Sequence, residues 1–328
     1  MGGLEWVAHH PGALRLIETF CTVHDPRLET RAFGLNFPSP VGLAAGFDKN
    51  ALAVPTWAAL GFGFVEIGSV TAQAQPGNPK PRLFRLPEDE ALINRMGFNN
   101  DGATVVAKRL EHLRERGFAS VPVGVNVGKS KVAPLDEAAE DYLASLQFLW
   151  PHGDYFVINV SSPNTPGLRA LQERERLTAL LSAVTEFAAE RPPKPLLLKL
   201  APDLSDAELA EIAELAVRFD LSGLVATNTT IAREGLRASV DETGGLSGRP
   251  LKKRALEVLT FLQSLGTGLP IVSVGGVRDA NDVWERLEAG ACLIQLYTSF
   301  VYEGPFLLRR LNRQLVGKLK EEKLHLTE

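Results

Sequence analysis

The stretch YFVINVSSPNTPG, residues 155–167, decides the fold, because in it an apolar strand ends in a polar loop. Tyr155-Phe156-Val157-Ile158 is short, continuous and partly β-branched, which predicts a buried strand. The chain then changes to amide and hydroxyl side chains, with two prolines and a glycine among them. Such residues either face a ligand or form an ordinary turn. This stretch alone leaves both interpretations open.

The same unit of strand, polar loop and amphipathic helix recurs from residue 31 onward. Alternating strands and helices build parallel βαβ units with right-handed crossovers. Eight near-equal units without a linker favour an α/β fold of the closed (β/α)8 type, a TIM barrel, over a doubly wound open sheet. The predicted strands are 40–46, 64–70, 123–128, 155–161, 196–201, 223–229, 270–276 and 291–298. The predicted helices include 103–116, 206–219, 251–265 and 279–289.

Composition limits the kinds of partner. The chain has 328 residues, 45% hydrophobic and 23% charged, with a formal net charge of −4. The slightly acidic balance and the lack of a Lys/Arg block argue against nucleic acid as a partner. Cys21 and Cys292 make no disulfide framework and stand in no metal-ligand spacing, so we expect no metal and a reducing cytoplasm. No apolar run reaches the ~20 residues of a membrane span, and no signal-peptide pattern is present.

Residues 1–30 differ from the rest of the chain, so we expect a helical extension there and a barrel over 31–328. Leu14, Ile17, Phe20 and Cys21 recur at helical spacing, which predicts a short amphipathic helix. Pro11-Gly12 and Asp25-Pro26 mark its limits. The helix either packs on the barrel or forms an apolar lid at a membrane surface.

Chemistry in such a barrel belongs at the carboxyl ends of the strands. Polar residues and glycines gather at nearly all the predicted ends. Helix caps are an alternative explanation for Ser69 and Thr298. Caps do not explain two lysines and several asparagines at one end of a barrel, so this end is predicted to be the site. The strand-end residues are Ala45 to Lys49, Gly68-Ser69, Asn126 to Gly128, Asn159 to Ser162, Lys199, Thr227 to Thr229, Gly275-Gly276 and Tyr297-Thr298.

Three connections are longer than plain turns. They run over 71–100 after the second strand, over 159–169 after the fourth, and through 244–250 after the sixth. Long connections in a compact domain are usually functional or disordered. Apolar residues among their polar groups make disorder the weaker interpretation.

Lys49 and Lys199 would lie in a mostly apolar mouth, where an unpaired ammonium is costly. Each is expected to face an anion, or else to pair with Asp48 or Asp203. Asn94, Asn159, Asn164 and Asn228 offer donors and acceptors that suit a small ring such as a pyrimidine. Gly275-Gly276 and Tyr297-Thr298 follow the last two strands, where barrels bind phosphate.

No histidine stands at the predicted strand ends, so a general base must be of another type, and Ser162 is the candidate. A serine serves as a base only if a polar network or water takes the proton onward. That favours a slow proton transfer coupled to a flavin over acyl transfer, and no Gly-x-Ser-x-Gly elbow is present.

Six blocks in this order closely resemble the dihydroorotate dehydrogenase family: AAGFDK (44–49), GNPKPR (77–82), INRMGFN (93–99), the opening stretch extended to Arg169, ATNTT (226–230) and GGLSGRP (244–250). The resemblance covers residues 30 to 310. It implies an FMN-dependent barrel that oxidises dihydroorotate to orotate in pyrimidine biosynthesis. The serine in the motif, where the soluble class 1 has a cysteine, resembles the quinone-using, membrane-associated class 2.

The resemblance also implies site residues. Ser162 would take the C5 proton while hydride leaves C6 for flavin N5, Lys199 would favour the anionic reduced flavin, and Arg85 would line the approach of the quinone. FMN would be held by Ala45, Gly46, Lys49, Ser69, Asn126, Asn159, Lys199, Thr227, Gly248, Gly276, Tyr297 and Thr298. Orotate would meet Lys49, Asn94, Arg95, Met96, Gly97, Phe98, Asn159, Asn164, Asn228 and Thr229.

The start of the chain departs from the class 2 pattern of two N-terminal helices around an apolar tunnel. Only some 30 residues precede the barrel, enough for one clear helix and a poor fragment before it. We expect reoxidation by a quinone and a peripheral place on the cytoplasmic side of the inner membrane, with contact to lipid. The alternatives are the same half-reaction with fumarate or NAD as a soluble acceptor, and a non-catalytic barrel used for binding.

Overall fold

Eight strands form a closed parallel barrel in the computed structural model, which describes residues 2–117, 120–237 and 240–326. Each strand pairs with the next, and the last pairs with the first. The predicted TIM barrel is confirmed. The barrel strands are β3 (Val41–Leu43), β4 (Val65–Val70), β7 (Val123–Val127), β8 (Tyr155–Asn159), β9 (Leu196–Leu200), β10 (Gly223–Ala226), β12 (Ile271–Val274) and β13 (Ala291–Leu296).

Most barrel strands are shorter than predicted at their carboxyl ends. The sixth was expected over 223–229, yet β10 stops at Ala226. The fourth was expected to reach residue 161, and β8 stops at Asn159. Beyond the end of β10, Thr227 and Asn228 still donate backbone hydrogen bonds to Val274 O and Leu200 O, and both residues line the mouth of the barrel.

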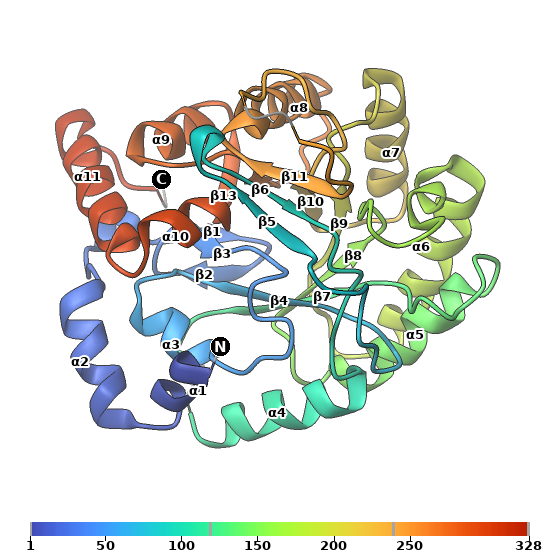
Figure 1. Ribbon diagram of the computed structural model, residues 1–328, viewed down its shortest axis with the longest axis horizontal. Coiled ribbons are helices and arrows are strands. Elements are labelled where there is room, and N and C mark those ends of the chain that lie inside the picture. Colours follow the sequence, from blue (N-terminus) through green and yellow to red (C-terminus); the bar gives the residue numbers. More distant parts are fainter. Residues whose placement is uncertain (1, 118–119, 238–239, 327–328) are drawn as a thin grey trace.

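Helices surround the barrel as a ring (Figure 1). On α6, for example, Leu177, Leu181 and Val184 recur at helical spacing and are buried against the barrel. The ring helices are α3 (Val54–Ala59), α4 (Ala103–Glu115), α5 (Ala138–Leu149), α6 (Arg174–Ala189), α7 (Asp206–Arg218), α8 (Lys252–Ser264), α9 (Ala280–Glu288), α10 (Thr298–Glu303) and α11 (Leu307–Glu322). Short 3-10 helices are η1 (Pro26–Leu28), η2 (Pro87–Asp89), η3 (Leu168–Gln172) and η4 (Arg249–Leu251).

The amino end of the barrel is plugged by apolar side chains. The hairpin of β1 (Thr30–Ala32) and β2 (Leu35–Phe37) brings Phe37 against Phe64, with ring centroids 5.4 Å apart. Tyr155, Val157 and Leu197 continue this inner cluster up the barrel. The apolar plug therefore leaves the carboxyl end as the place for a ligand in the part of the barrel that the structure describes.

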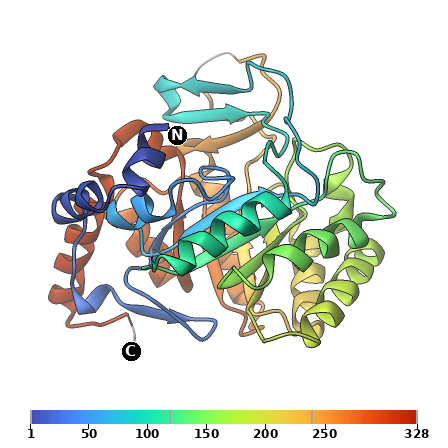
Figure 2. The ribbon, with the colours of Figure 1, turned by 90° about the horizontal axis from the view of Figure 1, so that it is seen from below.

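A second sheet covers part of the carboxyl end, and we call it the roof sheet. It consists of β5 (Leu83–Leu86), β6 (Ala91–Asn94) and β11 (Gly245–Gly248), all paired antiparallel. Figure 2 shows it at the opposite end of the barrel from the β1–β2 hairpin. These segments were expected to be loops, which was wrong, because β6 finds its partner β11 about 150 residues later.

Two helices precede the barrel, where the sequence predicted one. The predicted helix is α2 (Pro11–Cys21), and it begins with Pro11, which suits the first turn of a helix. The unexpected one is α1 (Gly2–Ala8), which is fixed to α3 by the Thr56 hydroxyl donating to Leu4 O at 2.8 Å. Among the described residues, no helix combines the length and the apolar character needed to cross a bilayer.

Closure of the barrel depends on a close approach at Gly63, just before β4. A Cβ at this position would lie 2.0 Å from the backbone oxygen of Ser39. We expect Gly63→Ala to lower the free energy of unfolding by about 1–3 kcal/mol, because buried backbone must move to accept the methyl group. Denaturant unfolding measures this. Gly12→Ala is the control, since its Cβ would meet nothing within 4 Å, and equal midpoints for the two variants would contradict the prediction.

Candidate active site

The carboxyl ends of the strands and the roof sheet enclose a cavity of about 1270 Å³, part of it open to solvent. Ser162 lines this cavity, and so do most residues predicted for either ligand. From the predicted FMN set these are Ala45, Gly46, Lys49, Ser69, Asn159, Lys199, Thr227, Gly248, Gly276, Tyr297 and Thr298; from the predicted orotate set they are Lys49, Asn94, Met96, Gly97, Phe98, Asn159, Asn164, Asn228 and Thr229.

Hydrogen bonds between side chains fix the amides of the cavity. Asn159 Nδ2 donates to Ser69 Oγ at 2.8 Å and to Asn126 Oδ1 at 3.1 Å. Asn228 Nδ2 donates to Ser161 Oγ at 2.9 Å and to Asn159 Oδ1 at 3.3 Å. Asn126 supports this network from below and is not itself a lining residue. The amides are thus oriented before any ligand binds.

Ser162 is buried, and its hydroxyl oxygen accepts a hydrogen bond from the backbone N–H of Asn164 at 3.3 Å. Asn164 in turn donates from its side chain to Asn94 Oδ1 at 3.0 Å, which joins this loop to the roof sheet. The backbone donor occupies one lone pair of the serine oxygen and leaves its O–H free to turn. This geometry suits a group that both accepts and passes on a proton.

The two lysines of the cavity have different surroundings. In the described part of the chain, no carboxylate lies within ion-pair distance of Lys49. Burial, with a smaller contribution from the charge of Arg82, lowers the pKa of Lys49 to about 8. Lys199 Nζ lies 3.4 Å from Glu66 Oε1, and both side chains are buried. Lys49 therefore offers its charge to an incoming anion, whereas Lys199 already shares a carboxylate.

Neither suggested lysine–aspartate pair occurs. The Asp48 carboxylate accepts hydrogen bonds from the amides of Leu52 and Ala53, each at 2.8 Å, and from Trp57 Nε1 at 3.1 Å. Asp203 pairs with Arg169, whose Nη1 lies 2.8 Å from its Oδ2. Asp48 is needed to hold the turn that carries Lys49, and Asp203 lies in another loop.

Gly275 and Gly276, in a loop predicted to bind phosphate, lie shortly before α9. The first amides of α9 do not face the cavity, because Asp279 caps the helix and its Oδ1 accepts from Asn281 N and Asp282 N. Among the hydrogen bonds of the described residues, the amides of Gly276 and Val277 have no acceptor, and both residues line the cavity. Gly276 has a φ of +74°, so the left-handed backbone that presents its amide favours glycine.

Besides Asn126, two predicted residues, Arg95 and Arg85, do not line the cavity. The guanidinium of Arg95 pairs with Glu242 and lies 4.5 Å from the ring centroid of Phe84, on the roof sheet. Arg85 lies 5.7 Å from the ring centroid of Tyr302, which lines the cavity. Arg85 also donates to Val301 O at 3.5 Å, beside a more open hollow that shares Gly46, Lys49, Met96 and Tyr297 with the main cavity.

A family model described as dihydroorotate dehydrogenase matches residues 27–319. The chain belongs to the dihydroorotate dehydrogenase family. The resemblance read from the six sequence blocks is therefore confirmed, and the barrel and its cavity are those of a flavoenzyme family.

Relatives at high identity carry the quinone-linked name. One is dihydroorotate dehydrogenase (quinone) of Thermus thermophilus, 60% identical over 299 residues that cover 91% of this chain and 84% of the relative. Another, of the same name, is from Thermosynechococcus vestitus, 54% identical over 317 residues that cover 93% and 85%. A solved structure of ligand-free dihydroorotate dehydrogenase from Eimeria tenella superimposes with a TM-score of 0.89 at 37% identity, covering 99% of this chain and 95% of that one.

The cavity has the chemistry that a flavin of this family requires. The unbonded amides of Gly276 and Val277 and the buried, unpartnered hydroxyl of Ser299 suit a phosphate. The half-buried ammonium of Lys49, the buried ammonium of Lys199 and the fixed asparagine amides suit the heteroatoms of a ring.

Residues that support this dehydrogenase cavity from below were missed at the level of sequence. Glu66, on β4, accepts from Asn126 Nδ2 at 2.8 Å and from Gln295, and it pairs with Lys199. The sequence feature that could have indicated this role is the position of Glu66, a charged residue inside an otherwise apolar strand. Arg286, on α9, is fully buried and donates to Gly275 O at 2.7 Å, and burial lowers its pKa to about 10.

Replacing Lys49 with methionine should stabilise the flavin-free protein at pH 7, because it removes a buried ammonium without a carboxylate partner. The pKa of Lys49 is about 8 in the folded protein, against an ordinary value of 10.5, so the unfolded chain binds more protons between these values. Wild-type stability then rises with pH across this window. The advantage of Lys49→Met, on the order of 3 kcal/mol at pH 7, should fade as the pH approaches 10.

Calorimetric melting of both proteins at pH 7 and pH 10 measures this difference. Lys253→Met on α8 is the control, since that side chain is 91% exposed. A stability difference for Lys49→Met that stays constant with pH would show that its ammonium is not the cause.

Proposed function

We propose that the cavity binds FMN and dihydroorotate together, with Ser162 as the base that takes a proton from C5 of dihydroorotate. The overall reaction follows from the family, since members of its quinone-linked class oxidise dihydroorotate to orotate in pyrimidine biosynthesis, and this chain is an oxidoreductase of that class. The observation that carries the proposal is one cavity lined by Ser162, Lys49 and the asparagine network.

FMN is proposed to lie with its phosphate at the loops after β12 and β13 and its ring near the two lysines. The free amides after β12 bind the phosphate, and the Lys199–Glu66 pair lies beneath the ring. Bound FMN supplies the two-electron acceptor for the hydride from C6. The residues proposed to hold it are Ala45, Gly46, Lys49, Ser69, Asn126, Asn159, Lys199, Thr227, Gly248, Gly276, Tyr297 and Thr298.

Dihydroorotate is proposed to bind between the roof sheet and the loops after β8 and β10. Lys49 faces its carboxylate, because an anion compensates the buried ammonium. Asparagine side-chain amides form hydrogen bonds with the N–H and C=O groups of its ring. Arg95 is proposed to contribute only through its backbone, since its side chain pairs with Glu242. The other proposed contacts are Asn94, Met96, Gly97, Phe98, Asn159, Asn164, Asn228 and Thr229.

Ser162 acts by exchanging one proton for another. A serine hydroxyl is far too weak an acid to be ionised at neutral pH, so it must pass its own proton to water in the open part of the cavity as it takes the one from C5. The Asn164 N–H, 3.3 Å from Oγ, stabilises negative charge on the oxygen during this exchange. The fixed amides around the ring hold C5 within reach of the hydroxyl.

Residues 1–30 are proposed to form the quinone-facing and membrane-facing part of the chain, and 31–328 the FMN-binding barrel. Large apolar side chains on α1, α2 and the α10–α11 connection are exposed: Trp6 at 57%, Leu16 at 61%, Phe20 at 53% and Phe306 at 62%. Such a group favours peripheral binding to a lipid surface. The free thiols of Cys21 and Cys292 favour the cytoplasmic side of the inner membrane. Arg85, near Val301, is proposed to line the approach of the quinone.

Replacing Ser162 with alanine should leave FMN bound and slow its reduction by dihydroorotate by ~10²–10⁴-fold, the usual contribution of a positioned acid–base group. Anaerobic stopped-flow absorbance measures the rate. Ser182→Ala is the control, because that serine lies half-buried on α6, outside the cavity, and its hydroxyl donates to Glu186. A normal rate of reduction in Ser162→Ala would exclude Ser162 as the base.

The double variant Trp6→Ser, Phe20→Ser should bind lipid vesicles more weakly and raise the KM for a long-chain quinone about tenfold or more, because it removes two exposed apolar anchors. The rate of flavin reduction by dihydroorotate should not change, since both residues lie outside the cavity. Vesicle sedimentation and steady-state kinetics measure the two effects.

Faster turnover with fumarate or NAD than with quinone, in the unmodified protein, would assign a soluble acceptor instead.

A further inference from the structure

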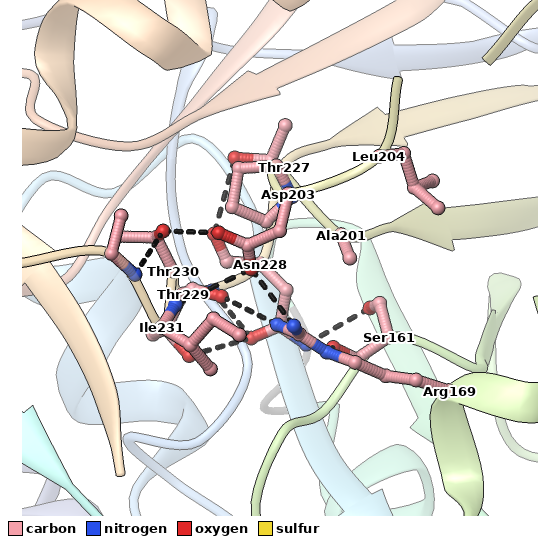
Figure 3. Close-up of polar contacts among 12 residues, drawn as sticks. Ser161, Arg169, Ala201, Asp203, Leu204, Thr227, Asn228, Thr229, Thr230 and Ile231 are labelled. Carbon is pink, nitrogen blue, oxygen red and sulfur yellow. Dashed lines mark hydrogen bonds and ion pairs between the residues drawn. The ribbon is translucent and has the colours of Figure 1, made fainter. Parts of the chain in front are cut away.

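Arg169 lies on η3, seven residues after Ser162, and its guanidinium joins three loops of the carboxyl end (Figure 3). Its Nε donates to the backbone oxygen of Ser161 at 3.1 Å. Its Nη2 donates to the backbone oxygen of Thr229 at 3.1 Å. Its Nη1 lies 2.8 Å from Asp203 Oδ2. One side chain thus touches the loops after β8, β9 and β10.

Asp203 extends this link on the other side of the pair. Its Oδ1 accepts from the hydroxyl of Thr230, and its Oδ2 accepts from the backbone N–H of Ile231 at 3.3 Å. The loop after β10 is therefore held twice, at the oxygen of Thr229 by Arg169 and at Thr230 and Ile231 by Asp203. Figure 3 shows these contacts converging from separate segments of the chain.

Neither member of the pair lines the cavity. The side chains of Arg169 and Asp203 are 23% and 20% exposed, so the pair is largely enclosed by the loops it joins and does not extend into the cavity. Their contacts are instead concentrated on the two segments that carry the proposed base and two proposed substrate ligands. Ser161 precedes Ser162, and Thr229 follows Asn228. The arrangement thus favours a role in geometry over a role in holding the fold.

A second contact joins the same two loops on the cavity side. Asn228 Nδ2 donates to Ser161 Oγ at 2.9 Å. The inner contact fixes the side chains, and the outer contacts of Arg169 fix the backbone of both loops. Together they determine how far the Ser162 hydroxyl lies from a ring held by Asn228 and Thr229.

We propose that the Arg169–Asp203 pair is a positioning device that sets the distance between the Ser162 hydroxyl and the substrate ring. This inference rests on the proposed role of Ser162 as the base. A lysine cannot replace Arg169, because one ammonium lacks the planar fork that reaches two carbonyl oxygens and a carboxylate at once. A displacement of about 1 Å at the reacting atoms can cost on the order of 100-fold in rate.

The test uses flavin-loaded Arg169→Met, Arg169→Lys and Asp203→Asn. We expect FMN content and melting temperature near those of the wild type, flavin reduction by dihydroorotate about 10–100-fold slower, and a weaker affinity for orotate. Arg174→Met is the matched control, because Arg174 forms comparable ion pairs with Glu211 and Glu214 on the outside of the helix ring. The control should reduce at the wild-type rate.

The double variant Ser162→Ala, Arg169→Met distinguishes an effect of Arg169 on the position of Ser162 from a general disturbance of the active-site structure. If Arg169 acts through Ser162, the Arg169→Met substitution should slow reduction far less in the Ser162→Ala background than in the wild type. An equal slowing in both backgrounds would overturn the inference, as would a normal rate in Arg169→Met. Where Arg169→Met fails to hold FMN, the same cycle is run with Asp203→Asn. A normal rate in Ser162→Ala alone would instead overturn the proposed function.

Discussion

Closure of eight parallel strands into one ring is the constraint on which the rest of the molecule depends. Because every strand runs the same way, every carboxyl end meets at one mouth. The amino end is filled by Phe37, Phe64 and their neighbours, so the mouth is the part of the barrel that is left for a ligand. Residues more than 200 positions apart in the chain, such as Glu66 and Gln295, therefore come within hydrogen-bond distance. The topology of the barrel thus determines where the site lies, and the particular side chains determine what it can bind.

Buried charge is distributed unevenly around that mouth, and the distribution has a chemical meaning. Lys199 shares Glu66, so it brings little net charge to the cavity floor. Lys49 has no such partner in the described residues, and burial holds down its pKa. A folded protein retains a buried ammonium of this kind when a ligand compensates it. The positive charge of Lys49 is thus uncompensated by the described residues, whereas that of Lys199 is compensated by Glu66.

The sequence was sufficient for the barrel and for the lining residues at the strand ends, because short continuous apolar runs and polar strand ends are local patterns. Other lining residues, such as Met96 and Phe98, were predicted from the resemblance to the family. The sequence was not sufficient for the roof sheet, since β6 and β11 are short and their pairing is not local. Nor did it identify α1, a seven-residue helix that depends on packing against α3. The sequence also did not predict the structural roles of Glu66, Arg286 and the Arg169–Asp203 pair, for a similar reason. Each works through a neighbour that only the folded chain brings close.

The roof sheet has a consequence for how the protein is made. Its apolar cluster is small, formed by Leu86, Ala91, Ile93 and Leu246, so it has little stability without the barrel below. Its central strand, β6, pairs with β11, which lies about 150 residues later in the chain. This pairing cannot stabilise the roof sheet until the intervening chain has folded. During synthesis on the ribosome, six barrel strands emerge before β11 does. A nascent chain therefore passes through a stage in which β5 and β6 are already made but the roof sheet still lacks β11 and the barrel still lacks β12 and β13.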